Sequence, residues 1–252
     1  MVSVFKRVIK GLVFRAGYDI SKRYDVRYAT RRSTLEDFIG HLRGLDFNPN
    51  TVIDVGVASG TPELYRGFSN SKHILIEPLE EFTPELRRIA TKYNVEYVSA
   101  AAGAKPGKAT FHVHTGDLEG SSLLRENDGP QVDGMPREVE VQTVDEICQR
   151  HQARGPMLLK VDVQGAEIEV LKGAEQTLYQ TEVIVLECSL FKFQEGALEL
   201  IDVIEYVRER GWAIYDLFGF RNRPLDGALA QLDVAFVQEK GRFRRSHRWA
   251  IR

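Results

Sequence analysis

Residues 51–60 decide the fold and read Thr51-Val52-Ile53-Asp54-Val55-Gly56-Val57-Ala58-Ser59-Gly60. The apolar side chains of the first half form a continuous run, which is typical of a strand covered on both faces in a parallel sheet. The glycines of the second half allow a tight turn and let the backbone approach a ligand without an intervening Cβ. The segment therefore predicts a buried strand that ends at a ligand-binding turn.

A second apolar run, His73-Ile74-Leu75-Ile76, ends in Glu77 and Pro78. Doubly wound folds place an acid here that accepts hydrogen bonds from ribose hydroxyls. The spacing of Gly56 and Gly60 lacks the full G-x-G-x-x-G pattern that holds a dinucleotide pyrophosphate at a helix start. S-adenosylmethionine has no phosphate, so an open glycine turn and the ribose acid suffice for it. Both cofactor classes fit these residues, and so does a purely structural turn between strand and helix.

The composition is that of an ordinary soluble globular protein, with 252 residues, 43% of them hydrophobic and 28% charged. Its cysteines, Cys148 and Cys188, have no C-x-x-C spacing, and we expect buried thiols in a reducing compartment. The chain has no apolar segment of the roughly 20 residues that span a bilayer, and its start lacks a signal-peptide core. We therefore expect a cytoplasmic protein.

Positive charge is concentrated at the two ends of a chain whose net charge is only −2. Residues 1–50 contain ten Lys and Arg against five Asp and Glu, and residues 240–252 contain six basic side chains and no acid. Residues 2–14 have the pattern of a basic amphipathic helix, which either lies peripherally on the anionic inner membrane face or packs on the domain. We expect a helical extension (1–48), a main domain (49–239) and a basic tail (240–252).

Apolar runs alternate with amphipathic segments along the chain. Strands are expected at residues 51–55, 73–76, 95–103, 109–114, 139–144, 157–161, 182–187, 212–217 and 231–237. Helices are expected at 33–44, 81–93, 145–151, 167–172 and 198–210, with a long loop at 115–137. This alternation predicts an α/β fold, a doubly wound Rossmann-like sheet with helices on both faces. Ligands then bind beyond the carboxyl ends of the strands.

Residues 50–238 resemble the FkbM-type methyltransferases, which use S-adenosylmethionine. The resemblance rests on Val52-Ile53-Asp54-Val55-Gly56, Ile76-Glu77-Pro78, Ser121-Ser122-Leu123, Thr143-Val144-Asp145 and above all Leu159-Lys160-Val161-Asp162-Val163-Gln164-Gly165-Ala166-Glu167 with Val170-Leu171-Lys172-Gly173. It implies a seven-stranded sheet with an antiparallel last strand at 231–237. It also implies methyl transfer to a hydroxyl, often of a sugar in a glycan, glycolipid or natural product. Val57-Ala58 departs from the family's usual Ala-Asn, and Gln164 from its commoner Glu.

Methyl transfer to oxygen is an in-line displacement, so the protein must position two atoms and help to remove the hydroxyl proton. Asp162, after the central strand, is the preferred base, with a cap of the following helix as the alternative. His112 and His114 are further candidates for the base or for ligands of a divalent metal that would acidify the hydroxyl. The sequence leaves metal dependence open.

The expected contacts fall into two groups. Cofactor contacts are expected from Asp54, Gly56, Ala58, Ser59, Gly60, Glu77, Pro78, Ala101, Ala102 and Asp162, where the two alanines leave room for a flat adenine ring. Acceptor contacts are expected from Ser121, Ser122, Glu167 and Glu187. Two alternatives remain, a cofactor-binding protein without catalysis and an O-methyltransferase of a molecule other than a sugar. Nucleic acid is not expected, because the Asn/Asp-Pro-Pro-Tyr loop and catalytic Cys motif of nucleic-acid methyltransferases are absent.

Overall fold

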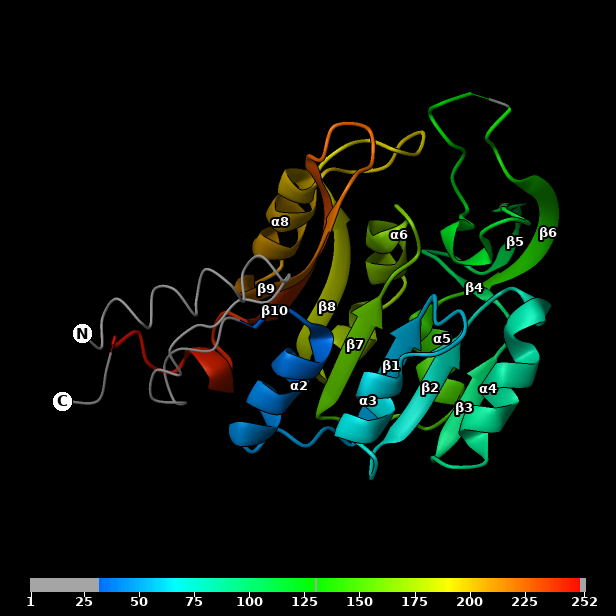
Figure 1. Ribbon diagram of the computed structural model, residues 1–252. Helices are drawn as coiled ribbons and strands as arrows, with labels where there is room; N and C mark the ends of the chain where they lie inside the picture. The colour runs from blue at the N-terminus through cyan, green and yellow to red at the C-terminus, as the bar shows by residue number, and fades with distance from the viewer. Residues whose placement is uncertain (1–31, 130, 250–252) are drawn as a thin grey trace, which may run out of the picture. The chain divides into compact units, whose positions relative to one another are not determined.

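The computed structural model describes residues 32–129 and 131–249, so the helix expected at residues 2–14 lies outside the described residues. The description below concerns the compact unit of residues 33–252. Its described residues contain a seven-stranded sheet and a separate three-stranded sheet (Figure 1).

The central sheet has the strand order β3-β2-β1-β7-β8-β10-β9. Five neighbouring strands are parallel, and they are β1 (Thr51–Val55), β2 (Lys72–Ile76), β3 (Val95–Val98), β7 (Met157–Val161) and β8 (Thr181–Ser189). The last strand, β10 (Leu229–Gln238), is antiparallel to both β8 and β9 (Trp212–Asn222). The topology confirms the predicted seven-stranded doubly wound sheet with an antiparallel last strand.

Helices cover both faces of this sheet, as predicted. One face is packed against α2 (Leu35–Gly44), α3 (Pro62–Gly67) and α4 (Thr83–Ala90). The other is packed against α5 (Val144–Arg150), α6 (Glu167–Lys172) and α8 (Leu200–Glu209), and the short α7 (Glu175–Leu178) follows α6. The helix expected at 81–93 is divided into the 3₁₀ turn η1 (Glu80–Phe82) and α4. Cys148 and Cys188 are buried free thiols, as expected.

Helix α2 belongs to the main core. Thr34 caps it, because its hydroxyl accepts a hydrogen bond from the Asp37 N–H at 3.1 Å while the Asp37 carboxylate accepts one from the Thr34 N–H at 3.2 Å. Phe38, with 0% exposure, stacks on Phe218 of β9 with ring centroids 5.0 Å apart. The expected extension of residues 1–48 thus includes a helix of the main domain.

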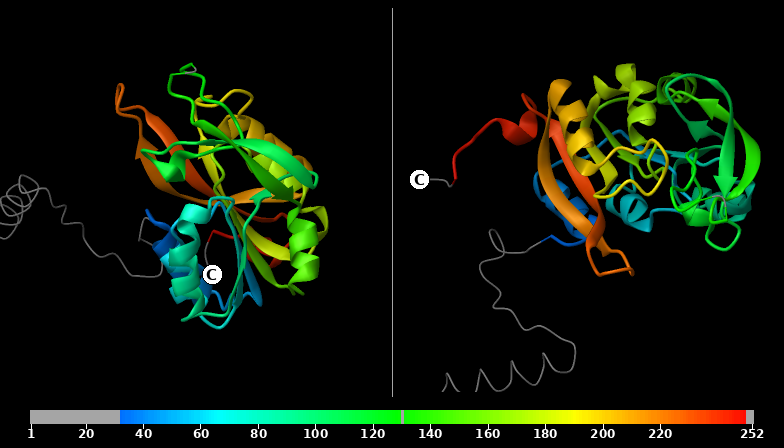
Figure 2. Two further views of the ribbon diagram at one scale, coloured as in Figure 1. Left: turned by 90° about the vertical axis from the view of Figure 1, so that its right-hand side faces the viewer. Right: turned by 90° about the horizontal axis from the view of Figure 1, so that it is seen from above.

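The three-stranded sheet was not predicted. It consists of β4 (Ala101–Ala102), β6 (Met135–Gln142) and β5 (Gly107–Val113), in that order. The third central strand was expected to reach residue 103, but it ends at Val98, and the chain then crosses to pair with β6. The expected loop at 115–137 contains the turn η2 (Leu118–Gly120) and the start of β6. Figures 1 and 2 show this small sheet beside the carboxyl ends of β1 and β2.

The start of the expected basic tail is attached to the domain through η3 (Arg242–Arg244). Arg242 donates a hydrogen bond to the Leu45 carbonyl at 2.7 Å, and the Phe243 ring packs edge-on against Phe47 with centroids 5.6 Å apart. Arg244 lies 3.2 Å from the carboxylate of Glu239. Two basic side chains of the tail are therefore engaged within the domain.

Candidate cofactor and acceptor site

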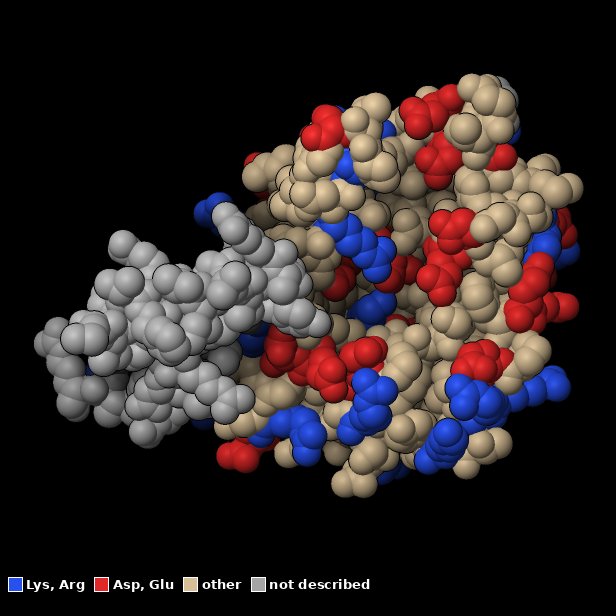
Figure 3. All heavy atoms as spheres, in the orientation of Figure 1, with Lys and Arg blue, Asp and Glu red and all other residues tan. Residues whose placement is uncertain are grey.

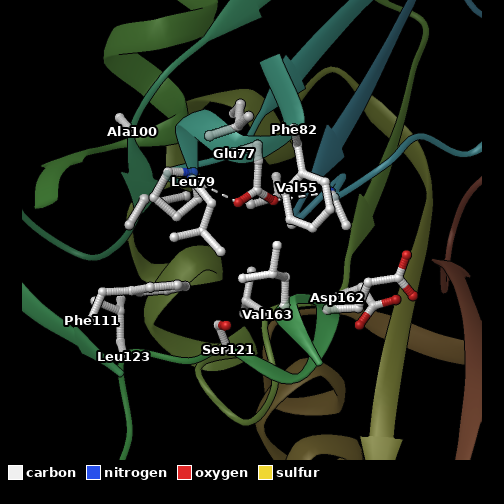
Figure 4. A pocket seen from close by; sticks show the side chains of 18 residues that line it. Val55, Glu77, Leu79, Phe82, Ala100, Phe111, Ser121, Leu123, Asp162 and Val163 are labelled. Carbon is white, nitrogen blue, oxygen red and sulfur yellow. Dashed lines mark hydrogen bonds between the residues drawn. The ribbon is translucent and has the colours of Figure 1, made fainter. Parts of the chain in front are cut away.

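An apolar cavity of about 480 Å³ lies where the ends of β1, β2 and β7 meet the small sheet (Figure 4). Its walls are mostly apolar side chains, including Val55, Ile76, Phe82, Phe111, Leu118 and Leu123. Another part of the lining is formed by Ala100 and by the two residues of β4, Ala101 and Ala102. Such walls suit a flat aromatic ring such as adenine.

Glu77 places a carboxylate in this apolar cavity, as Figure 4 shows. Its Oε2 accepts a hydrogen bond from the Ala58 N–H and its Oε1 accepts one from the Leu79 N–H, both at 2.9 Å. Burial raises the pKa of Glu77 to about 7. Each carboxylate oxygen can accept more than one hydrogen bond. The fixed carboxylate can therefore also accept hydrogen bonds from ribose hydroxyls, the role predicted for it.

The glycine turn after β1 presses closely against the loop after β7. Gly56 has φ +72°, and a Cβ there would collide with the main-chain oxygen of Asp162. The N–H groups of Gly56 and Val57 both point to the Ile76 carbonyl, at 3.0 and 3.4 Å, and the Gly60 N–H donates to Val57 at 2.8 Å. Because these N–H groups are already donated within the protein, the turn is unsuited to a dinucleotide pyrophosphate.

A second, polar cavity of about 820 Å³ adjoins the first. The two share Gly56, Ala58, Glu119 and Asp162, so they meet at the end of β1. The rest of the polar cavity is lined mainly by the turn after β1 and by charged or amide side chains, including Asp117, Lys160, Gln164, Arg221 and Gln231. Figure 3 shows side chains of both charges around the hollow in this face.

Asp162 lies at the junction of the two cavities. Its Oδ2 is 3.1 Å from the Lys160 ammonium, and its Oδ1 accepts a hydrogen bond from Gln164 at 2.9 Å. Burial raises the pKa of Asp162, but the charges of Lys160 and Arg221 and the hydrogen bonds from Lys160 and Gln164 together outweigh burial, and the net direction is downward. The alternative role as a helix cap is wrong, since α6 begins at Glu167 without a side-chain cap. Asp162 is thus an ionised carboxylate held from two sides.

Glu187 lies outside the polar cavity and orients two amide side chains that line it. It accepts hydrogen bonds from Gln164 and Gln231 at 2.9 and 3.0 Å, and lies 3.1 Å from the guanidinium of Arg221. Burial raises the pKa of Glu187 to about 8, with the neighbouring Asp162 acting in the same direction. Glu187 itself is 7% exposed and is outside the lining of both cavities. It was expected to contact the acceptor, and the structure gives it a supporting position.

A model of the FkbM methyltransferase domain matches residues 54–212 of this chain. The chain belongs to the FkbM family of S-adenosylmethionine-dependent methyltransferases. It is also similar to the 2-O-methyltransferase NoeI of Sinorhizobium fredii (strain NBRC 101917 / NGR234), with 32% identity over 117 residues. That alignment covers 42% of this chain and 48% of NoeI, so the chain spans about half the length of this relative. The resemblance in the sequence is confirmed.

Solved methyltransferases are similar at low identity. The N-methyltransferase NodS from Bradyrhizobium japonicum WM9 gives a TM-score of 0.46 at 6% identity, covering 81% of this chain and 93% of NodS. Fibrillarin from Aeropyrum pernix, solved with natively bound S-adenosylmethionine, gives 0.42 at 12% identity, covering 74% of this chain and 66% of fibrillarin.

Most residues predicted to contact the cofactor line a cavity of this FkbM domain. Those at the apolar cavity are Gly56, Ala58, Glu77, Pro78, Ala101, Ala102 and Asp162, joined by Ser121, which had been expected at the acceptor. Ser59 and Gly60 line the polar cavity. Four further residues of the cavity linings were not among the predicted contacts, and they are Lys160, Arg221, Gln231 and Glu119. Lys160 could have been identified from the sequence, because it is the one charged residue in the apolar strand Met157–Val161.

Three predicted site residues instead hold the loops in place. Asp54 has 0% exposure and accepts a hydrogen bond from the Tyr65 hydroxyl at 3.3 Å. The Ser122 hydroxyl donates to the Gln164 carbonyl at 2.8 Å. Glu167 accepts a hydrogen bond from the Gly165 N–H at 3.1 Å, at the start of α6. None of the three lines the apolar or the polar cavity.

The two predicted histidines also lie outside both cavities. Nδ1 of His112 is 3.1 Å from Asp133, and Nε2 of His114 is 3.7 Å from Glu126. Within residues 32–129 and 131–249 no three His, Cys, Asp or Glu side chains are grouped as a metal site would require. A catalytic or metal-binding role of these histidines therefore has no support in this geometry.

Proposed function

We propose that the protein is an O-methyltransferase that uses S-adenosylmethionine to methylate a hydroxyl of a sugar, in a glycan, a glycolipid or a glycosylated natural product. The observation that carries the proposal is the junction of two unlike cavities at Asp162. The apolar cavity suits an adenosine. The polar cavity presents carboxylates, amides and a guanidinium, the groups that form hydrogen bonds with sugar hydroxyls.

The residues present fit S-adenosylmethionine. Glu77 would hold the ribose, and the apolar walls would hold the adenine. When bound, this cofactor supplies an electrophilic methyl group on a sulfonium. The protein excludes water from the adenosine side through the apolar side chains of the small sheet.

Asp162 accepts the proton of the acceptor hydroxyl in this proposal. The acceptor oxygen becomes strongly acidic as its new bond to carbon forms, so a carboxylate of low pKa is basic enough, provided that it is ionised and fixed. Lys160 and Gln164 supply both conditions through their contacts with the two carboxylate oxygens. Arg221 and Gln231 line the same polar cavity, and in this proposal they orient the acceptor. The similarity to a 2-O-methyltransferase supports transfer to oxygen.

Transfer of a labelled methyl group tests the function. The purified protein is incubated with methyl-¹³C-labelled S-adenosylmethionine and with methyl glycosides, oligosaccharides and extracted glycolipids, and the products are analysed by mass spectrometry. We expect a labelled methyl ether on a sugar hydroxyl, and its loss from the glycans or lipids of cells without the gene. Label on nitrogen, on a molecule that is not a sugar, or on nothing would contradict the proposal.

We also propose reversible association with an anionic membrane through the basic ends. The described helices are all too short or too polar to span a bilayer, and a basic residue near an anionic surface contributes about 1 kcal/mol. Arg245 and Arg248 are exposed beyond the attached part of the tail. We expect co-sedimentation with phosphatidylserine vesicles at low salt that is lost when residues 1–16 and 245–252 are removed. Equal co-sedimentation of the shortened chain, or none by the intact chain, would contradict this.

A further inference from the structure

Lys160 is a buried cation in the wall of the polar cavity. All five residues of β7 are buried, and Lys160 itself is 8% exposed. Its ammonium lies 3.1 Å from Asp162 and 4.0 Å from Asp54. Burying a charged ammonium is costly even when it is paired. A residue of this kind in a cavity wall is therefore a candidate for binding a ligand.

The charges around Lys160 match one part of the proposed cofactor. S-adenosylmethionine carries a sulfonium and an α-ammonium but a single negative group, the α-carboxylate. The polar cavity has the complementary charges, because three acids line it, Asp117, Glu119 and Asp162. The cations that line it among the described residues are Lys160 and Arg221. An anion in this cavity therefore has few partners to choose from.

The neighbouring groups favour Lys160 over the other donors. The N–H groups of Gly56, Val57, Ala58 and Gly60 are donated within the protein, so the glycine turn offers little to a carboxylate. Arg221 has a side chain that is 66% exposed and is held against Glu187, away from the apolar cavity. Lys160 contacts Asp162, which belongs to both cavities. The methionyl part of a cofactor whose adenosine lies in the apolar cavity would enter the polar cavity at Asp162. The Lys160 ammonium is the cation next to this point.

We propose that Lys160 binds the α-carboxylate of the methionyl part of S-adenosylmethionine. The inference rests on the proposed cofactor and deepens it by assigning the second half of the molecule to the polar cavity. Asp54 and Asp162 then fix the ammonium from the protein side, and the ligand carboxylate completes its hydrogen bonds. The acceptor occupies the remaining part of the polar cavity, towards Gln231 and Arg221.

Calorimetry with two ligands tests this assignment without an acceptor. S-adenosylhomocysteine contains the amino-acid part, and 5′-methylthioadenosine has the same nucleoside without it. Lys160→Met should weaken binding of S-adenosylhomocysteine about tenfold or more, since a charge-assisted bond is lost, and should leave 5′-methylthioadenosine unchanged. Lys160→Arg should retain most of the affinity for both. Unchanged binding of 5′-methylthioadenosine also shows that the Met variant is folded.

A comparison on the unaltered protein covers the case in which Lys160→Met does not fold. Decarboxylated S-adenosylmethionine should bind about tenfold or more weakly than S-adenosylmethionine, because only the carboxylate differs. Equal binding of this pair would overturn the inference, as would a selective loss in Arg221→Met with none in Lys160→Met. Failure of the unaltered protein to bind any of these nucleosides would instead contradict the proposed cofactor.

Discussion

Asp162→Asn is expected to lower kcat for methyl transfer by about 10²–10⁴, the usual contribution of a positioned general base. Asparagine keeps the volume of the side chain and can still bond to Gln164, but it cannot accept the hydroxyl proton. Lys160 keeps its second carboxylate, Asp54, so we expect a melting temperature within a few degrees of that of the unaltered protein. The measurement is label transfer to the acceptor identified with ¹³C-labelled cofactor.

Asp128→Asn is the matched control, because Asp128 is an exposed carboxylate outside both cavities. It should leave kcat unchanged. Binding of S-adenosylhomocysteine to Asp162→Asn separates a chemical defect from a binding defect and should change far less than kcat. If Asp162→Asn transfers methyl groups at the rate of the control, Asp162 is not the base.

The central fold could be predicted because its strands are covered on both faces. Strands β1, β2 and β7 therefore appear in the sequence as continuous apolar runs, and Gly56 and Gly165 mark where two of them end. The antiparallel last strand came from the family resemblance, since a short apolar run gives no direction. The small sheet could not be predicted, because a run such as Ala101–Ala102 does not say which sheet its hydrogen bonds join.

The position of each predicted acid relative to the end of its strand explains whether its side chain reaches a cavity. Glu77 and Asp162 are the first residues after β2 and β7, so their side chains project beyond the sheet into the cavities. Asp54 and Glu187 precede the ends of β1 and β8, and their side chains remain within the packed rim. A sequence shows that an acid is near a strand end, but a shift of one residue decides between a ligand contact and a buried support.

Glu77→Gln is expected to weaken binding of S-adenosylhomocysteine about tenfold or more, because a charged acceptor is worth about 1.5–3 kcal/mol per hydrogen bond. Glutamine has one oxygen, whereas Glu77 accepts hydrogen bonds from both the Ala58 and the Leu79 N–H. One N–H therefore also loses its partner, and the glycine turn loosens beside the ligand. Calorimetry at pH 8 measures the loss. The control is Glu80→Gln, an exposed neighbour outside the apolar cavity, which should bind normally.

The pH dependence of binding identifies Glu77 as the ribose acceptor. Burial raises the pKa of Glu77 to about 7, so below neutral pH the free protein carries a proton there. Ribose hydroxyls donate to the ionised form, so binding lowers the pKa and releases that proton. Affinity for S-adenosylhomocysteine should therefore rise by up to about tenfold per pH unit as the pH approaches 7 from below, and level off above it. Glu77→Gln should abolish this rise and Glu80→Gln should keep it. A rise that persists in Glu77→Gln would assign the proton to another group and leave the ribose without its proposed partner.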